Sequence, residues 1–142
     1  MIEKLNMFKE LNKIIENEIT EDNLDAFSVI VGANPSKGAR SPILWNKVYE
    51  TENKKMKMLP LDVSQENFNE LYIWLQANPK CLGGAVAVPY KESMFNLLKH
   101  NLQKEIVSIG AINCFYRKNK DNFETFTGTN TDGEGALAAI QT

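Results

Sequence analysis

Apolar residues recur every three or four positions at the start of the chain, which is the spacing of one face of an amphipathic helix. The positions concerned are Ile2, Leu5, Phe8, Leu11 and Ile15. This pattern predicts a helix that packs on the body of the protein. Residues 1–25 are therefore interpreted as an N-terminal helix and linker, and residues 26–142 as the main domain.

Short apolar runs then alternate with helical patterns. The β-branched run SVIVGAN, which Gly32 and Asn34-Pro35 stop, predicts a buried strand. MKMLPLDV and GGAVAVP predict a second and a third strand. Helices are predicted from Ser41-Pro42, after Ser64 and from Lys91. In the first of these helices, the residues expected to face inward are Ile43, Leu44, Val48 and Tyr49.

The last third of the chain predicts an antiparallel element. SIGAINCFYRK and NFETFTGTN resemble two strands of a hairpin around residues 119–122, and a final helix is expected from about Asp132. Alternating strands and helices of 10–15 residues are typical of an α/β protein. The expected fold is a three-layer sandwich, with an open, mainly parallel sheet covered by helices on both faces.

Composition and charge exclude several kinds of partner. The 142 residues carry 16 basic and 18 acidic side chains, mixed along the chain, so there is no basic stripe to bind nucleic acid. The start of the chain lacks the apolar core of a signal peptide, and no stretch is apolar for long enough to cross a membrane. We therefore expect a cytoplasmic, soluble protein. The two cysteines, Cys81 and Cys114, have no metal-binding spacing and are expected to be reduced thiols.

Candidate chemistry lies where strands are expected to end, because ligands of open α/β sheets bind outside the carboxyl ends of the strands. The polar residues at those ends are Asn34, Ser41, Lys91, Asn113, Asn130 and Asp132. Lys91 starts a helix, where its cation opposes the positive end of the macrodipole, so a functional role is favoured. If Asp132 lies nearby, the pair can pass a proton to or from a substrate hydroxyl.

Each candidate also has a structural interpretation. Lys91 and Asp132 can form an ordinary surface salt bridge, and Asp132 can cap the final helix. Ser41 is a plausible helix cap, and Asn113 is a buried amide whose partners can be backbone groups. The single histidine, His100, is expected to be solvated at a helix end.

Residues 133–138, GEGALA, match the dinucleotide fingerprint in form only. A cofactor site needs a following strand and an acidic residue about 20 positions further on. The chain stops at Thr142. These residues alone are therefore not expected to bind a nucleotide.

Five segments together resemble, in order and spacing, the N-terminal domain of the shikimate and quinate dehydrogenase family. They are VIVGANPSKGARSPILWN, LPLDV, GGAVAVPYKE, IGAINCF and GTNTDGEGALAAI. The resemblance implies an oxidoreductase of aromatic amino acid (chorismate) biosynthesis that interconverts 3-dehydroshikimate and shikimate, or a related cyclic hydroxy acid, with NADP. It also implies a separate NADP-binding Rossmann domain, absent from this chain, without which the chain is expected to be inactive.

The family's motifs assign roles to individual residues. Lys91 and Asp132 match the catalytic pair at the reacting hydroxyl and also touch the substrate. Asn113 matches the asparagine that binds ring hydroxyls, and Ser41 matches the second serine of a pair that binds the substrate carboxylate. Nothing in the sequence argues for a metal role.

Four positions depart from the family's pattern. Gly38 stands where the family has a histidine. Ala39 replaces the first serine of the carboxylate-binding pair, and Ala85 and Ala87 replace an amide and a hydroxyl. Arg40 is a candidate to compensate with a bidentate grip on a carboxylate. The departures leave an alternative open, namely a stand-alone binding module that kept the fold and lost the reaction.

Overall fold

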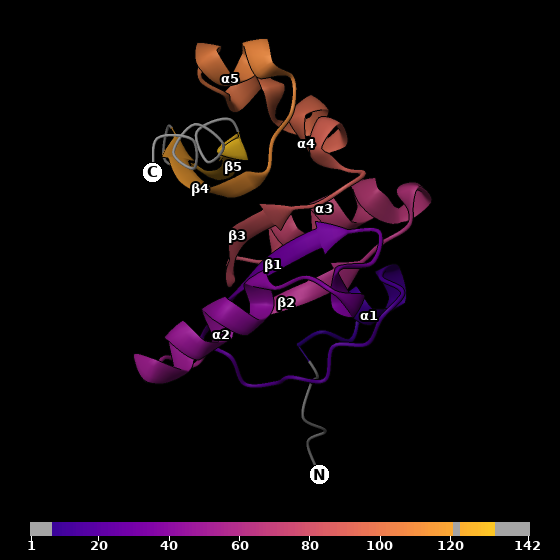
Figure 1. Ribbon diagram of the computed structural model, residues 1–142, viewed down its shortest axis with the longest axis vertical. Coiled ribbons are helices and arrows are strands. Elements are labelled where there is room, and N and C mark those ends of the chain that lie inside the picture. The colour runs from indigo at the N-terminus through magenta and orange to yellow at the C-terminus, as the bar shows by residue number, and fades with distance from the viewer. Residues whose placement is uncertain (1–6, 121–122, 133–142) are drawn as a thin grey trace.

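The computed structural model describes residues 7–120 and 123–132. Figure 1 shows how their helices and strands are arranged. In chain order, these elements are α1 (Leu11–Ile14), β1 (Ala26–Gly32), the 3-10 helix η1 (Pro35–Lys37), α2 (Ser41–Thr51), β2 (Met56–Asp62), η2 (Gln65–Asn67), α3 (Phe68–Ala77), β3 (Cys81–Val86), α4 (Lys91–Leu98), η3 (Lys99–Asn101), α5 (Lys104–Ile109), β4 (Cys114–Lys120) and β5 (Phe123–Thr129).

The sheet is mixed, and its five strands lie in the order β2-β1-β3-β4-β5. β1 pairs in parallel with β2 and β3, whereas β4 runs antiparallel to both β3 and β5. The expected hairpin is confirmed as β4 and β5, with residues 121 and 122 of its turn outside the described part of the chain. The α/β fold class is thus confirmed. The final helix expected from about Asp132 falls on residues 133–142, which are also outside it.

Helices cover both faces of the sheet because side chains alternate along each strand. Phe27 and Val29 of β1 point to the face covered by α1 and α3, where they join the main hydrophobic cluster. Ser28, between them, points to the other face and shares a 3.1 Å hydrogen bond with Tyr49 of α2. Figure 1 shows α2 beside β1 and β2, apart from α3.

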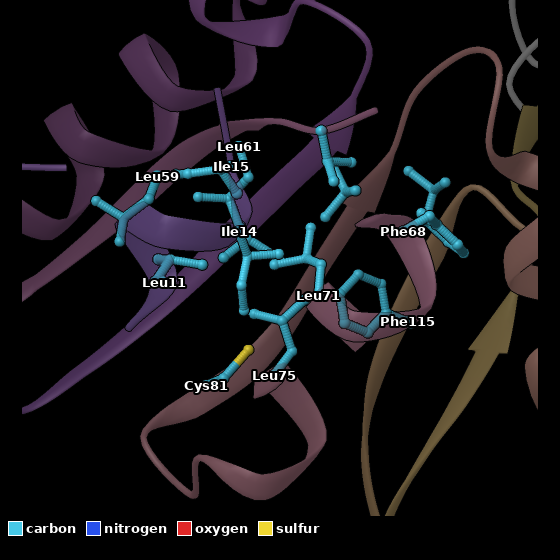
Figure 2. Packing of buried hydrophobic residues seen from close by; sticks show 14 of the residues in the cluster. Leu11, Ile14, Ile15, Leu59, Leu61, Phe68, Leu71, Leu75, Cys81 and Phe115 are labelled. Atoms are coloured by element: carbon cyan, nitrogen blue, oxygen red, sulfur yellow. The ribbon is translucent and has the colours of Figure 1, made fainter. Parts of the chain in front are cut away.

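Side chains from both helices and strands form one hydrophobic cluster, which is the core. Figure 2 shows side chains of α1, α3 and β2 meeting over the sheet. The labelled members include Leu11, Leu59, Leu71 and Leu75, each at most 2% exposed. Burying a leucine of this kind contributes about 1.5–3 kcal/mol. This packing gives the site a rigid support.

The N-terminal helix is much shorter than the apolar spacing predicts. α1 ends at Ile14, since Ile15 has extended backbone with a ψ of 164°. Of the predicted stripe, Phe8, Leu11 and Ile15 are buried, and Ile2 and Leu5 lie outside the described residues. The described part of the segment, residues 7–25, does pack on the body as expected, but only Leu11–Ile14 of it is α-helix.

Polar bonds to β2 explain why the helix stops. The side chain of Asn17 donates to the carbonyl of Pro60 at 2.8 Å and accepts from the amide of Asp62 at 2.8 Å. The amide of Glu16 donates to the Asp62 carbonyl at 2.8 Å. These bonds satisfy backbone groups on the outer edge of the sheet, and extended chain reaches them better than a helix does.

The predicted inward face of α2 is wrong for three of its four residues; the fourth, Tyr49, does face the sheet and bonds to Ser28. Ile43 and Leu44 are 71% and 65% exposed, and Val48 is also exposed. The helix instead turns Asn46 toward β2, where its side chain accepts from the amide of Met58 at 2.7 Å and donates to its carbonyl at 3.3 Å. Hydrogen bonds to the unpaired backbone groups at the edge of β2 therefore decide the rotation of α2 about its axis. The apolar residues of the helix are left exposed to solvent.

Candidate functional site

The candidate site lies at the edge of the sheet where the three parallel strands end. β1 leads into the loop 33–40, β2 leads into Val63, and β3 leads through residues 87–90 into α4. Because β1, β2 and β3 run in the same direction, these three connections lie side by side.

Lys91 is the first residue of α4, as the sequence predicts. The residue before it, Tyr90, is buried and donates its hydroxyl to the Val63 carbonyl at 2.6 Å. Its ring stacks on Phe68, with the centroids 4.7 Å apart. The Lys91 carbonyl accepts from the amide of Ile112 at 3.0 Å. Anchored on both sides, Lys91 starts the helix from a fixed position and directs its ammonium outward.

Asp132 meets Lys91 from a distant part of the chain. The Lys91 Nζ lies 2.9 Å from Oδ2 of Asp132, and the Nδ2 of Asn113 donates to Oδ1 of the same carboxylate at 2.8 Å. The amide of Asp132 also donates to the side chain of Asn130 at 2.9 Å. The carboxylate is thus held by one cation and one amide, in a defined orientation.

Thr131 also belongs to this cluster, although the sequence analysis did not select it as a site residue. Its hydroxyl accepts from the Asn113 Nδ2 at 2.9 Å, and its backbone amide donates to the Asn113 Oδ1 at 3.1 Å. Thr131 therefore orients the side-chain amide of Asn113 through both its nitrogen and its oxygen. The only sequence signal for Thr131 is its place between Asn130 and Asp132.

The electrostatics of the cluster favour a charged pair. Hydrogen bonds from Lys91 and then Asn113, with the charge of Lys91 adding to them, hold the pKa of Asp132 below its ordinary value of 3.8. The side chains of Lys91 and Asp132 are 32% and 55% exposed, so both can reach a ligand from solvent. An ammonium fixed beside a carboxylate can deliver or accept a proton at an alcohol oxygen.

Asn113 does not lie within a strand, in contrast to the prediction. The expected strand SIGAINCFYRK contains the end of α5, which Gly110 closes with a φ of 75°, and β4 begins only at Cys114. Asn113 lies in the bend between them and is half-buried rather than buried. Its amide donates to the Thr129 carbonyl at 3.1 Å, and its carbonyl accepts from Val86 at 2.8 Å, so two neighbouring strands hold it.

The remaining predicted residue, Ser41, is not part of the cluster. It is the first residue of α2, and no hydrogen bond or ion pair within residues 7–120 and 123–132 joins it to Lys91, Asn113 or Asp132. The expected helix-cap bond from its side chain is also not seen; Arg40 occupies the capping position. The Arg40 side chain is exposed.

A cavity of about 280 Å³ lies where β1 and β3 end. Its lining residues are Ala33, Asn34, Pro35, Ala39, Ala87 and Val88. A second cavity, of about 290 Å³, lies between η3 and the hairpin and is lined in part by His100. Ser41, Lys91, Asn113 and Asp132 line neither of these two cavities. His100 itself is exposed, as expected.

Fold and site together define a class of protein, an α/β domain that binds a small molecule at the carboxyl edge of its parallel strands. Residues 30–115 match the family described as the shikimate dehydrogenase substrate binding domain. The chain belongs to this family.

Known proteins support the same assignment. The chain is 30% identical, over 109 residues, to a shikimate dehydrogenase (NADP(+)) of Nostoc sp., a match that covers 77% of this chain and 36% of that protein. It is 26% identical over 115 residues to a quinate dehydrogenase of Emericella nidulans, covering 75% and 35%. The crystal structure of shikimate dehydrogenase 1 from Peptoclostridium difficile superimposes with a TM-score of 0.67 at 26% identity, covering 82% of this chain and 40% of that one. The chain thus spans little more than a third of the curated relatives it matches.

Proposed function

We propose that this chain is the substrate-binding domain of an NADP-dependent oxidoreductase that interconverts a hydroxyl and a ketone on shikimate or a related ring compound. In this proposal residues 26–142 form that domain and residues 1–25 its N-terminal helix and linker. In this proposal NADP binds mainly to a second domain of the intact protein, and the chain alone is inactive.

One observation carries the proposal, the ion pair between Lys91 and Asp132 at the ligand-binding edge of the sheet. The bound cofactor supplies or accepts the hydride at the ring carbon. In the direction of reduction, the Lys91 ammonium donates its proton to the oxygen of that carbon as the alcohol forms. In the reverse direction, the same pair takes up the hydroxyl proton. Asp132 holds the ammonium at the reacting oxygen.

Asn113 and Ser41 complete the proposed contacts with the substrate. The Asn113 amide is oriented by Thr131 and lies beside Asp132, so it can bind a ring hydroxyl next to the one that reacts. Ser41 starts α2 at the far side of the loop that follows β1. Its hydroxyl is proposed to bind the opposite end of the substrate.

The test is a turnover assay in a protein that carries this chain together with its cofactor domain, following the reduced nicotinamide with shikimate and with quinate. Lys91→Met should lower kcat by roughly a hundredfold to ten-thousandfold, because the proton donor is lost. Lys99→Met, at an exposed lysine of η3, is the matched control and should leave kcat unchanged. A Lys91→Met variant with the kcat of the wild type would remove Lys91 from the mechanism.

A second candidate function is a binding module without the reaction. Ala39 and Ala87, which line the cavity where β1 and β3 end, favour it, since neither side chain offers a hydrogen bond to a polar substrate. The two candidates differ in the same assay. Ligand-dependent stabilisation of the folded chain without any turnover in the two-domain protein would favour the module.

A further inference from the structure

The second cavity, of about 290 Å³, lies between η3 and one face of the hairpin formed by β4 and β5. Lys118 and Thr125 are paired across this hairpin, and Thr127 lies two positions further along β5, so the three side chains point to the same face. Residues 100–103 close the cavity from the opposite side. The lining residues are His100, Asn101, Leu102, Gln103, Lys118, Thr125 and Thr127.

A buried hydrogen bond ties the two walls of this cavity together. The hydroxyl of Thr127, a residue that is only 6% exposed, donates to the Asn101 carbonyl at 2.7 Å. The bond joins β5 to the end of η3. Because both walls are already held in place, a ligand does not have to order them when it binds.

The ionisable side chains that line the cavity are all basic. Lys118 carries a positive charge, and the imidazole of His100 can donate from a ring nitrogen in either charge state. The acidic residues that lie next to lining residues or close to them in the chain, Glu105 and Glu124, do not line the cavity. Within the described part of the chain, neither Lys118 nor His100 forms an ion pair. The cavity therefore presents a cation that no described carboxylate pairs with.

Neutral hydrogen-bond donors lie beside these bases. The side-chain amide of Gln103 and the hydroxyl of Thr125 form no hydrogen bond within residues 7–120 and 123–132, so both are available to a ligand. The backbone carbonyl of Gln103, which would repel an anion, already accepts from the amides of Ile106 and Val107 at 3.0 and 3.1 Å. The carbonyl of Asn101 is occupied by the bond from β5. Donors thus outnumber free acceptors, as an anion requires.

The size of the cavity limits the ligand to a small molecule. About 290 Å³ is at the lower end of the range for ligand pockets. Leu102 contributes the one wholly aliphatic side chain of the lining, so a short apolar part of a ligand can lie beside the polar groups.

We infer that this cavity is a second ligand site, which binds a small organic molecule through an oxyanion, either a carboxylate or a phosphate group. Lys118 and His100 pair with its charge. Gln103 and Thr125 donate to its oxygens, and Leu102 contacts the rest of the molecule. The inference is independent of the proposed function, because no residue of the candidate site lines this cavity.

The test uses the single histidine of the chain, whose imidazole resonance in proton NMR reports on the cavity. Inorganic phosphate and acetate are added separately to the full 142-residue chain, at constant pH and with chloride holding the ionic strength constant. The His100 resonance should shift and saturate with at least one of them. In Lys118→Met the dissociation constant should rise at least about tenfold, because a hydrogen bond to a charged group is lost. The anion that binds more tightly identifies the oxyanion.

Two further variants complete the experiment. Lys99→Met is the matched control, because it removes the same charge next to His100 from an exposed side chain that does not line the cavity. Its dissociation constant should equal that of the wild type. Thr125→Val removes one neutral donor and keeps the shape of the side chain, so it should weaken binding by about twofold to tenfold. This variant keeps the test decisive if Lys118→Met disturbs the hairpin.

Two outcomes would overturn the inference. One is a His100 resonance that does not saturate with either anion. The other is a loss of affinity that is equal in Lys99→Met and Lys118→Met, since the anions would then only screen the charge of the surface. Neither outcome bears on the proposed function, which the turnover assay tests separately.

Discussion

Tyr90 is the residue on which the position of Lys91 most clearly depends. Its hydroxyl donates to the Val63 carbonyl at 2.6 Å, inside the core, and its ring stacks on Phe68. Tyr90→Phe removes one oxygen atom and keeps the ring. The stacking should survive, so the variant isolates the hydrogen bond between the start of α4 and the residue after β2.

The expected cost follows from burial at both ends of that bond. Tyr90 is 3% exposed and Val63 is 1% exposed, so water cannot easily replace the lost donor. Leaving a buried acceptor without its partner costs about 1–3 kcal/mol. At roughly 3 °C per kcal/mol for a domain near this size, the melting temperature should fall by about 3–9 °C.

The free energy of unfolding is measured by urea denaturation, with circular dichroism as the signal. Tyr116→Phe is the matched control, because it removes the same atom from a side chain that is 45% exposed. That variant should stay within about 0.5 kcal/mol of the wild type. If Tyr90→Phe is as stable as Tyr116→Phe, the bond to Val63 does not anchor α4, and our account of how Lys91 is held is wrong.

Three further predictions concern other parts of the molecule. Hydrogen bonds hold the pKa of Asp132 below 3.8, so its stabilising contribution is present above that pH and is lost as the pH falls through the lowered pKa. In Lys91→Met the pKa, followed by carbon-13 NMR of the carboxyl group, should rise toward 3.8; no rise would show that the ion pair does not form in solution. Burial raises the pKa of the Cys81 thiol to about 11, so a thiol reagent at neutral pH should label the half-buried Cys114 first, and equal rates would contradict this burial. Asn46→Ala leaves an amide and a carbonyl on the outer edge of β2 without partners, and should destabilise the protein by about 1–3 kcal/mol in urea denaturation. An unchanged midpoint would mean that water satisfies this edge.

Much of the site could be predicted from local sequence. Lys91 stands at a helix start, where a cation is locally unfavourable, and Asp132 follows a strand pattern. An α/β pattern places both at the ends of strands, where ligands bind. The Lys91 Nζ and the Asp132 Oδ2 lie 2.9 Å apart, as this placement at strand ends predicts, although the two residues are 41 positions apart in the chain.

The rotation of α2 could not be predicted in this way. Helical periodicity assigns the inward face to the most apolar stripe, and here that stripe contains Ile43 and Leu44. In the structure, Asn46 takes the inward position because β2 is an edge strand with unpaired backbone groups. Periodicity carries no information about which strand lies at an edge.

Local pattern by itself determined the α/β class, the approximate places of the five strands and the residues available for acid–base chemistry, because these depend on neighbours within about ten positions. The tertiary structure alone decided where α1 ends and how α2 is rotated. It also decided the position of Asn113 between two strands and the contact of Thr131 with the Asn113 side chain. The first two depend on which backbone groups of the edge strand β2 are left unpaired, because a polar residue that the fold brings there must satisfy them. The last two depend on contacts between segments that are far apart in the chain.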